Sequence, residues 1–162
     1  HYEDGSGYCT ACQMEIKSTP GLIYEISEDG SYATVTEYIG KQTIIRIAEE
    51  YRGVPVTHVG TSFLGGTRVT EVIFADNITH IDDSAFHTQT ALTTLKNTDG
   101  ITHIGQAAFY MCYSLRMSEL PKNIQVIGPN AFGDCEKISI NKNTFVDKNA
   151  FNECPAEIIW RD

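Results

Sequence analysis

The sequence has few basic residues and no long hydrophobic run, and each shortage excludes a class of protein. It contains 12 Lys and Arg against 21 Asp and Glu, a formal net charge of -9. Because a polyphosphate backbone would repel such a chain, we do not expect nucleic acid as a partner. No apolar run approaches the roughly 18 residues of a membrane-spanning helix, so we expect no membrane span in this chain. The opening residues, "HYEDGSGY", are too polar for a signal peptide, so an export signal would lie outside the chain.

Motifs that carry catalysis or nucleotide binding are also missing from the sequence. It holds no "G-x-S-x-G", no "H-E-x-x-H", no P-loop and no "G-x-G-x-x-G". We therefore expect neither an enzyme nor a bound cofactor. Hydrophobic residues still make up 41% of the 162 positions, which is enough to bury a core.

What the sequence does have is a repeat. Phenylalanines recur every 23 residues and once more after 19, at Phe63, Phe86, Phe109, Phe132 and Phe151. Four or five residues before each Phe stands an aliphatic residue, at Val59, Ile81, Ile104, Ile127 and Val146. Fixed spacing over this length indicates a repeat architecture, in which each unit buries its apolar side against a copy of itself.

Each repeat of about 23 residues predicts one short strand and one short helical turn. From Val69 the chain reads "VTEVIFA" and from Leu92 "LTTLKNT", with apolar residues favoured at the first, fourth and sixth places. The segment "GQAAFYMC" has the propensity for a helical turn but not for a long helix. We expect about five such units, with equivalent side chains about one strand spacing apart in successive coils.

The segment "ITHIGQAAFYMCYSLRMSELPKNI" resembles the BspA-like leucine-rich repeat, whose unit joins an "I-x-x-I-G-x-x-A-F-x-x-C" half to an "L-x-x-I-x-I-P" strand. The resemblance implies an α/β fold, a right-handed leucine-rich-repeat solenoid with an N-terminal β-hairpin cap. Asn97 and Ser118 depart from it, because they are polar residues in strand positions expected to be apolar. The expected organisation is a Cys-containing leader over residues 1–20, a β-rich capping region over 21–53 and the solenoid over 54–162.

The same resemblance implies a function in binding rather than catalysis. Bacterial proteins with this repeat look like adhesins and host-interaction modules, so we expect a location outside the cell or on its surface and a protein or glycan ligand. The alternative is a structural spacer or scaffold within a larger surface protein, with no ligand of its own. An open terminal coil could also allow weak self-association, because unpaired strand edges are templates for pairing.

Outward positions on the predicted strands form the candidate binding strip. A stack of strands presents a broad and rigid surface whose exposed side chains can vary without touching the core. A merely solvated sheet face remains an equal alternative, since these positions hold no aromatic anchor. The strip comprises Thr70, Glu71, Thr93, Thr94, Arg116, Met117, Glu119, Glu136 and Lys137.

Histidines and cysteines supply the candidate metal ligands. His58, His80 and His103 occupy one slot in three successive repeats, so stacking should align their imidazoles as a zinc site or a pH-sensitive patch. Repeat duplication in a surface slot that tolerates polar residues is the stronger explanation of the three histidines. Cys9 and Cys12 form a C-x-x-C pair outside the repeats, which is half of a zinc site, a short disulfide loop or two free thiols. By contrast, Cys112, Cys135 and Cys154 fall on a repeat slot and are expected to be buried free thiols.

Overall fold

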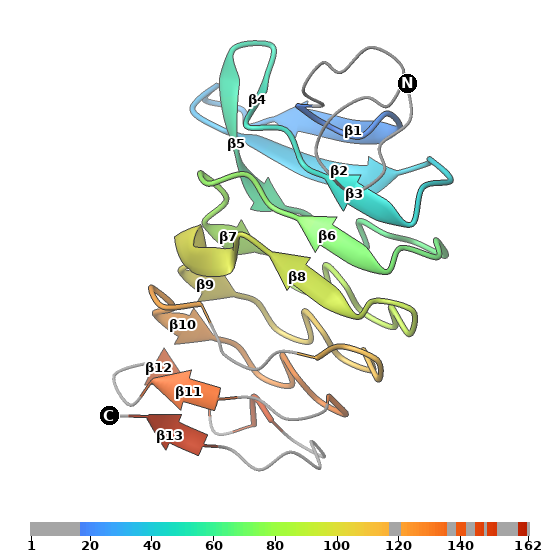
Figure 1. Cartoon of the computed structure of the whole chain (residues 1–162). Helices are drawn as coiled ribbons and strands as arrows, with labels where there is room; N and C mark the ends of the chain where they lie inside the picture. Colours follow the sequence, from blue (N-terminus) through green and yellow to red (C-terminus); the bar gives the residue numbers. More distant parts are fainter. Residues whose placement is uncertain are drawn as a thin grey trace.

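The computed structural model describes residues 17–116, 121–135, 139–141, 145–147, 149–151 and 159–161. Over this part of the chain the backbone winds as a stack of similar coils, with the first strands at one end and the last at the other (Figure 1). Short strands recur on two sides of the stack, and turns without regular structure occupy a third side. Successive coils therefore stack along one axis, as a repeat of this length predicts.

The larger sheet runs in the order β1-β2-β5-β7-β9-β10-β12, with β4 paired to β5. From β2 onward the strands along this path are parallel, and His58, His80 and His103 pair in register along β5, β7 and β9. Because alternate residues of a strand point to opposite faces, each His faces outward while the aliphatic residue after it is buried. The strands are β1 (Leu22–Ile26), β2 (Ala33–Tyr38), β4 (Glu50–Tyr51), β5 (Val54–Val59), β7 (His80–Ile81), β9 (His103–Ile104), β10 (Val126–Ile127) and β12 (Phe145–Val146).

A second parallel sheet stands across the core from the first. It runs β3-β6-β8, with β3 at Ile44–Arg46, β6 at Glu71–Ile73 and β8 at Thr94–Lys96. These last two are the strands that the spacing from Val69 and Leu92 predicts, and Figure 1 shows them side by side. A separate parallel pair joins β11 (Ser139–Asn141) to β13 (Ile159–Arg161).

Two expectations about the repeat need correction. A repeat has two strands rather than one. The second strand, at the histidine slot, was missed because its two residues are too few to show an alternating pattern in the sequence. The predicted helical turn does not form, and within the described residues the sole helix is a 3-10 turn, η1 (Thr98–Gly100). The segments around each Phe are instead chains of tight turns.

Hydrogen bonds between coils explain why these segments are not helical. The Phe86 N–H donates to the carbonyl of Ala108 at 2.8 Å, and the Phe109 N–H to Ala131 at 2.7 Å. These donors would bond within their own segment in an α-helix. Residues flanking each Phe take left-handed backbone angles, with φ of 52° at Ala107 and 59° at Met111, which no right-handed helix contains.

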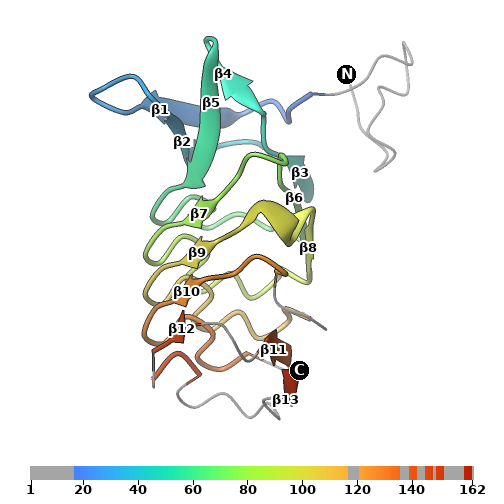
Figure 2. The same cartoon turned by 90° about the vertical axis from the view of Figure 1, so that its left-hand side faces the viewer.

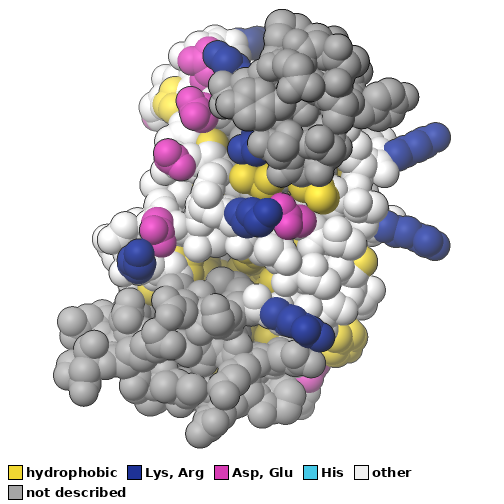
Figure 3. All heavy atoms as spheres, in the orientation of Figure 1, with side chains coloured by type: hydrophobic (Ala, Val, Ile, Leu, Met, Phe, Trp, Pro, Cys, Tyr) yellow, Lys and Arg dark blue, Asp and Glu magenta, His cyan; other side chains and the backbone are white. Residues whose placement is uncertain are grey.

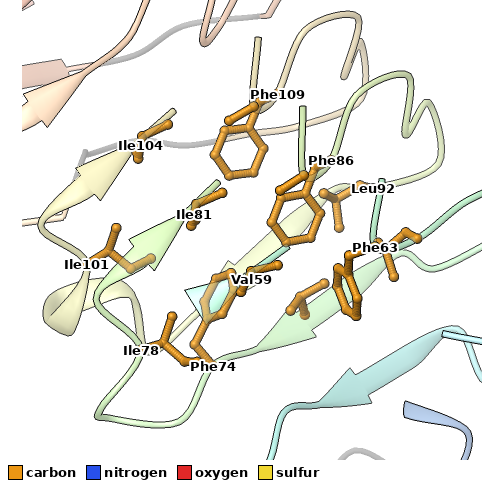
Figure 4. Packing of buried hydrophobic residues seen from close by; sticks show 14 of the residues in the cluster. Val59, Phe63, Phe74, Ile78, Ile81, Phe86, Leu92, Ile101, Ile104 and Phe109 are labelled. Atoms are coloured by element: carbon orange, nitrogen blue, oxygen red, sulfur yellow. The ribbon is translucent and has the colours of Figure 1, made fainter. Parts of the chain in front are cut away.

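Phenylalanines form the spine of the core. Phe86 and Phe109 stack with ring centroids 5.0 Å apart and planes at 5°, and Phe109 stacks on Phe132 at 5.3 Å. The first ring, Phe63, meets Phe86 edge-on at 5.6 Å. Figure 4 shows Phe63, Phe86 and Phe109 following one another through successive coils, beside the aliphatic residues of the larger sheet. All four rings are buried completely, so they hold the two sheets and the turn side together.

The N-terminal end of the stack carries the predicted antiparallel hairpin of β1 and β2. Its turn is ordered by Asp29, whose carboxylate accepts hydrogen bonds from the Ser31 N–H and from the hydroxyls of Ser27 and Ser31. Those bonds lower the pKa of Asp29 to about 2. Figure 2 shows this hairpin and the ribbon of β4 and β5 gathered at the same end of the stack. The predicted boundaries at residues 20 and 53 stay predictions.

Candidate functional site

The described part of the candidate strip lies on one face of the smaller sheet and its continuation. Glu71 pairs in register with Thr94. The N–H of Thr93 donates to the Thr70 carbonyl at 2.9 Å, and the N–H of Arg116 donates to the Thr93 carbonyl at 3.1 Å. The structure therefore brings these five residues together across three coils. The other predicted members, Met117, Glu119, Glu136 and Lys137, lie outside the described residues.

An ion pair joins this strip to a residue that the sequence reasoning missed. The Nζ of Lys96 lies 2.7 Å from Oε1 of Glu71, and the Lys side chain is about half exposed, at 51%. Figure 3 shows basic and acidic side chains meeting in the middle of this face. The signal for Lys96 was strand alternation, because Leu95 packs against the core and its neighbours Thr94 and Lys96 point away from it.

A shallow recess of about 470 Å³ opens on the same face, lined by Thr93, Thr94, Tyr113, Ser114 and Arg116. Tyr113 is 50% exposed and was also missed. It stands where earlier repeats have Thr67 and Thr90, so it departs from their small polar residues. Every residue lining the recess carries a hydroxyl or a guanidinium group, which makes the recess polar with one aromatic wall.

The three histidines stack as the repeat spacing predicts. Ring centroids lie 4.4 Å apart between His58 and His80, and 4.5 Å between His80 and His103, with planes within 12° and 9° of parallel. Tyr32 extends the stack, its ring 4.2 Å from that of His58. A hydrogen bond of 2.8 Å joins the Nδ1 atom of each imidazole to the hydroxyl of the threonine before it. The result is a rigid column of four rings on the outer face of the larger sheet.

Protonation of two histidines in this column is disfavoured. Burial lowers the pKa of His58, and the nearby charge of His103 lowers it further. Burial also lowers the pKa of His80, with repulsion from both neighbouring imidazoles outweighing the attraction of Asp82. Asp82 is itself partly buried, which raises its pKa. Both shifts favour the neutral form of His58 and of His80.

Metal binding by these residues stays a prediction. Zinc requires nitrogen atoms that converge on one point at about 2 Å, whereas stacked parallel rings direct their nitrogens side by side. Among the described residues, no group of three or more His, Cys, Asp or Glu is placed to hold a metal ion. Cys9 and Cys12 lie outside the described residues.

Two of the cysteines on the repeat slot, Cys112 and Cys135, have a structural role in the core. Both are buried, as predicted, while Cys154 lies outside the described residues. Cys112 donates its S–H to the carbonyl of Phe86 at 3.0 Å, and Cys135 to that of Phe109 at 3.2 Å. Burial raises the pKa of Cys112 to about 12, which keeps it a thiol and leaves it unreactive.

Short parallel strands on two sides, a phenylalanine spine and turns bonded from coil to coil define a solenoid of the leucine-rich-repeat class. A model of the BspA type leucine rich repeat region matches residues 55–158 with 6 copies. The chain belongs to this family. The match finds one more copy than the five or so that the phenylalanines predict. A search of curated protein sequences gives no significant match.

Solved structures of bacterial leucine-rich repeat proteins share the fold. The Treponema pallidum protein TpLRR superposes with a TM-score of 0.72 at 22% identity, over 86% of this chain and 69% of that one. A protein from Bacteroides ovatus gives 0.69 at 22% identity, over 88% of this chain and 40% of its own. A protein from Bacteroides capillosus superposes with a TM-score of 0.63 at 19% identity, over 91% of this chain and 100% of that one. At these identities the likeness shows the fold alone.

Family and fold together indicate a protein-interaction or scaffold module. Solenoids of this class are typically not enzymes, since their surfaces offer broad contact rather than a deep enclosed site. The part of the chain that the structure describes contains no helix with the length and hydrophobicity needed to cross a bilayer.

Proposed function

We propose that this chain is a binding module of a secreted or cell-surface protein, and that it contacts a protein or glycan ligand through the strip on β6, β8 and the next coil. The observation that carries the proposal is the recess beside Arg116. Its guanidinium is exposed and makes no ion pair with any described residue. A cation left unpaired beside an exposed aromatic ring is typical of an interaction surface.

Rigidity of the scaffold supports the same function. The backbone of the strip is held by hydrogen bonds to the coil before it, as in the 2.7 Å bond from the Thr70 N–H to the Thr43 carbonyl. Beneath it, Val69 and Val72 are buried completely. A surface fixed in this way loses little conformational entropy when a ligand binds. Catalysis is not expected, because the five members of the strip that the structure describes include no nucleophile paired with a base.

Charge reversal on the strip tests the proposal. Arg116→Glu should abolish binding to extracellular-matrix proteins or arrayed glycans that the unmodified chain retains. Lys122→Glu makes the same charge change at an exposed position paired loosely to Asp99 at 3.7 Å, and should leave binding intact. Equal loss in both variants would show a nonspecific charge effect and contradict the proposal.

The alternative remains a spacer that holds other domains apart. It predicts that neither the unmodified chain nor any strip variant retains a ligand. Binding that survives every strip substitution would place the binding surface elsewhere on the solenoid.

A further inference from the structure

We propose that the recess of Thr93, Thr94, Tyr113, Ser114 and Arg116 is a subsite for an acidic sugar, a saccharide unit that carries a carboxylate or a sulfate. This inference rests on the proposed function and names the ligand chemistry of its strip. Three features of the recess carry it: the hydroxyls of its threonines, the exposed ring of Tyr113, and a guanidinium that makes no ion pair with the described residues.

The hydroxyl of Thr93, which lines the recess, can accept hydrogen bonds. The Oγ1 atom of Thr93 donates to the Thr70 carbonyl at 3.0 Å, so its proton is committed and its remaining lone pair is left for other donors. Its second contact is the hydroxyl of Thr94 at 3.3 Å. Sugar hydroxyls donate as well as accept, and they match a lining of this kind better than an apolar side chain would.

The ring of Tyr113 supplies an apolar wall. Stacked or edge-on ring contacts are formed by several described aromatics, such as Tyr24 with Tyr51 at 5.1 Å, but Tyr113 forms none of those seen among the described residues. Its exposed face can pack against the C–H face of a pyranose ring, which is the apolar side of an otherwise polar molecule. Such packing costs little side-chain entropy, since a tyrosine has few rotatable bonds.

Arg116 adds the preference for a negative group. A column of threonines from successive coils leads to Arg116. The N–H of each residue donates to the carbonyl of its counterpart in the coil before, from Thr70 to Thr43, from Thr93 to Thr70 and from Arg116 to Thr93. The planar fork of Arg116 can form two parallel hydrogen bonds to one carboxylate or sulfate. Its positive charge, exposed beside the hydroxyls of the recess, favours an anion at this point.

The size and openness of the recess suit one or two sugar rings. Its volume of about 470 Å³ lies within the roughly 300–1,000 Å³ of small-ligand sites. Because the recess is shallow, a single unit would bind weakly, and strong retention would require several units along a polymer.

Binding of matched small probes tests the inference. A disaccharide that ends in glucuronic acid is titrated into isotope-labelled protein and followed by amide NMR shifts, beside its glucose counterpart and a glutamate-containing tripeptide. We expect the acidic sugar to bind about tenfold or more tightly than either of the others, with shifts at Thr93, Thr94 and Ser114. A second acidic disaccharide, sulfated instead of carboxylated, separates the two sources of negative charge.

Variants assign the roles within the recess. Arg116→Gln should remove the preference for the acidic sugar by about tenfold and leave weak binding of the neutral one. Tyr113→Ala should weaken both sugars, whereas Tyr113→Phe should keep them. Arg68→Gln makes the same charge change at an exposed position outside the recess and should alter nothing.

The inference is overturned if acidic and neutral sugars bind alike, if the tripeptide binds best, or if Arg116→Gln has no effect. Because these probes are separate from the partner assay, the two proposals can fail independently. Strip variants that abolish partner binding without any acidic-sugar preference would leave the proposed function standing and refute the acidic-sugar subsite.

Discussion

Phenylalanine stacking should appear as a measurable coupling between neighbouring coils. Phe86 and Phe109 lie 5.0 Å apart with nearly parallel rings, and both are buried completely. Replacing either one by Leu removes ring contacts and leaves a partly filled space. We expect each single variant to lose about 1–2 kcal/mol of unfolding free energy.

The double variant carries the prediction. Aromatic pairs contribute about 0.5–1.5 kcal/mol beyond the area that they bury. Once one ring of the pair has gone, the second substitution no longer removes that contact. Phe86→Leu with Phe109→Leu should therefore cost about 0.5–1.5 kcal/mol less than the sum of the two single variants.

Phe86→Leu with Phe132→Leu is the matched control. Phe109 stands between these two rings, contacting each of them. Their effects should add within about 0.5 kcal/mol. Urea unfolding followed by circular dichroism measures all five variants, and a constant m-value confirms that the unfolding transition has kept its character. Equal coupling in both pairs would refute the stacked spine and with it the coil-on-coil geometry.

Further predictions concern the histidine column, the turn side and the coil corners. Burial lowers the pKa of His80, so on acidification the unfolded chain takes up a proton at this residue before the folded chain does. The free energy of unfolding should therefore be greatest above about pH 6.5 and should fall as the pH drops toward the lowered pKa of the folded state. The unfolding temperature of His80→Gln should depend less on pH over this range. Ala107→Gly should gain about 0.5–1 kcal/mol in urea unfolding, because its φ of 52° strains any residue with a Cβ, whereas buried Ala108→Gly should lose about 1 kcal/mol. Gly105→Ala should lower the free energy of unfolding by about 1–3 kcal/mol, because the added Cβ would lie 2.6 Å from the backbone of the previous coil. In the control, Gly65→Ala, the added Cβ has an ordinary contact at 3.5 Å, so the free energy of unfolding should not change.

Inward positions could be read from the sequence because stacking constrains them. A residue at the Phe slot must fit between two copies of itself, so Phe86, Phe109 and Phe132 repeat with one spacing and predict the coil-on-coil core. The same arithmetic predicts the histidine column, since an outward slot on a strand is also one strand spacing from its counterpart.

Local conformation was less predictable, because bonds between coils overrule propensity. Ala107 and Ala108 favour a helix in isolation. In the fold, Ala107 has a left-handed backbone and its N–H donates to Pro129 of the next coil at 2.9 Å. A window of one repeat contains no trace of that partner. The two-residue strand at His80 was hidden for a different reason, since two residues are too few to show an alternating pattern.

Outward residues follow a different rule, and the candidate site shows why. Stacking requires nothing of an exposed side chain, so a repeat that has only been duplicated would carry the same residue from coil to coil, as Thr70 and Thr93 do. Arg116 interrupts that column, and in the same coil Tyr113 replaces the small threonines of its own slot, Thr67 and Thr90. Neither change improves the core, since both side chains are exposed. Two departures that meet around one recess are what the ligand contact that we propose would require, because an exposed cation and an exposed ring can together bind one ligand.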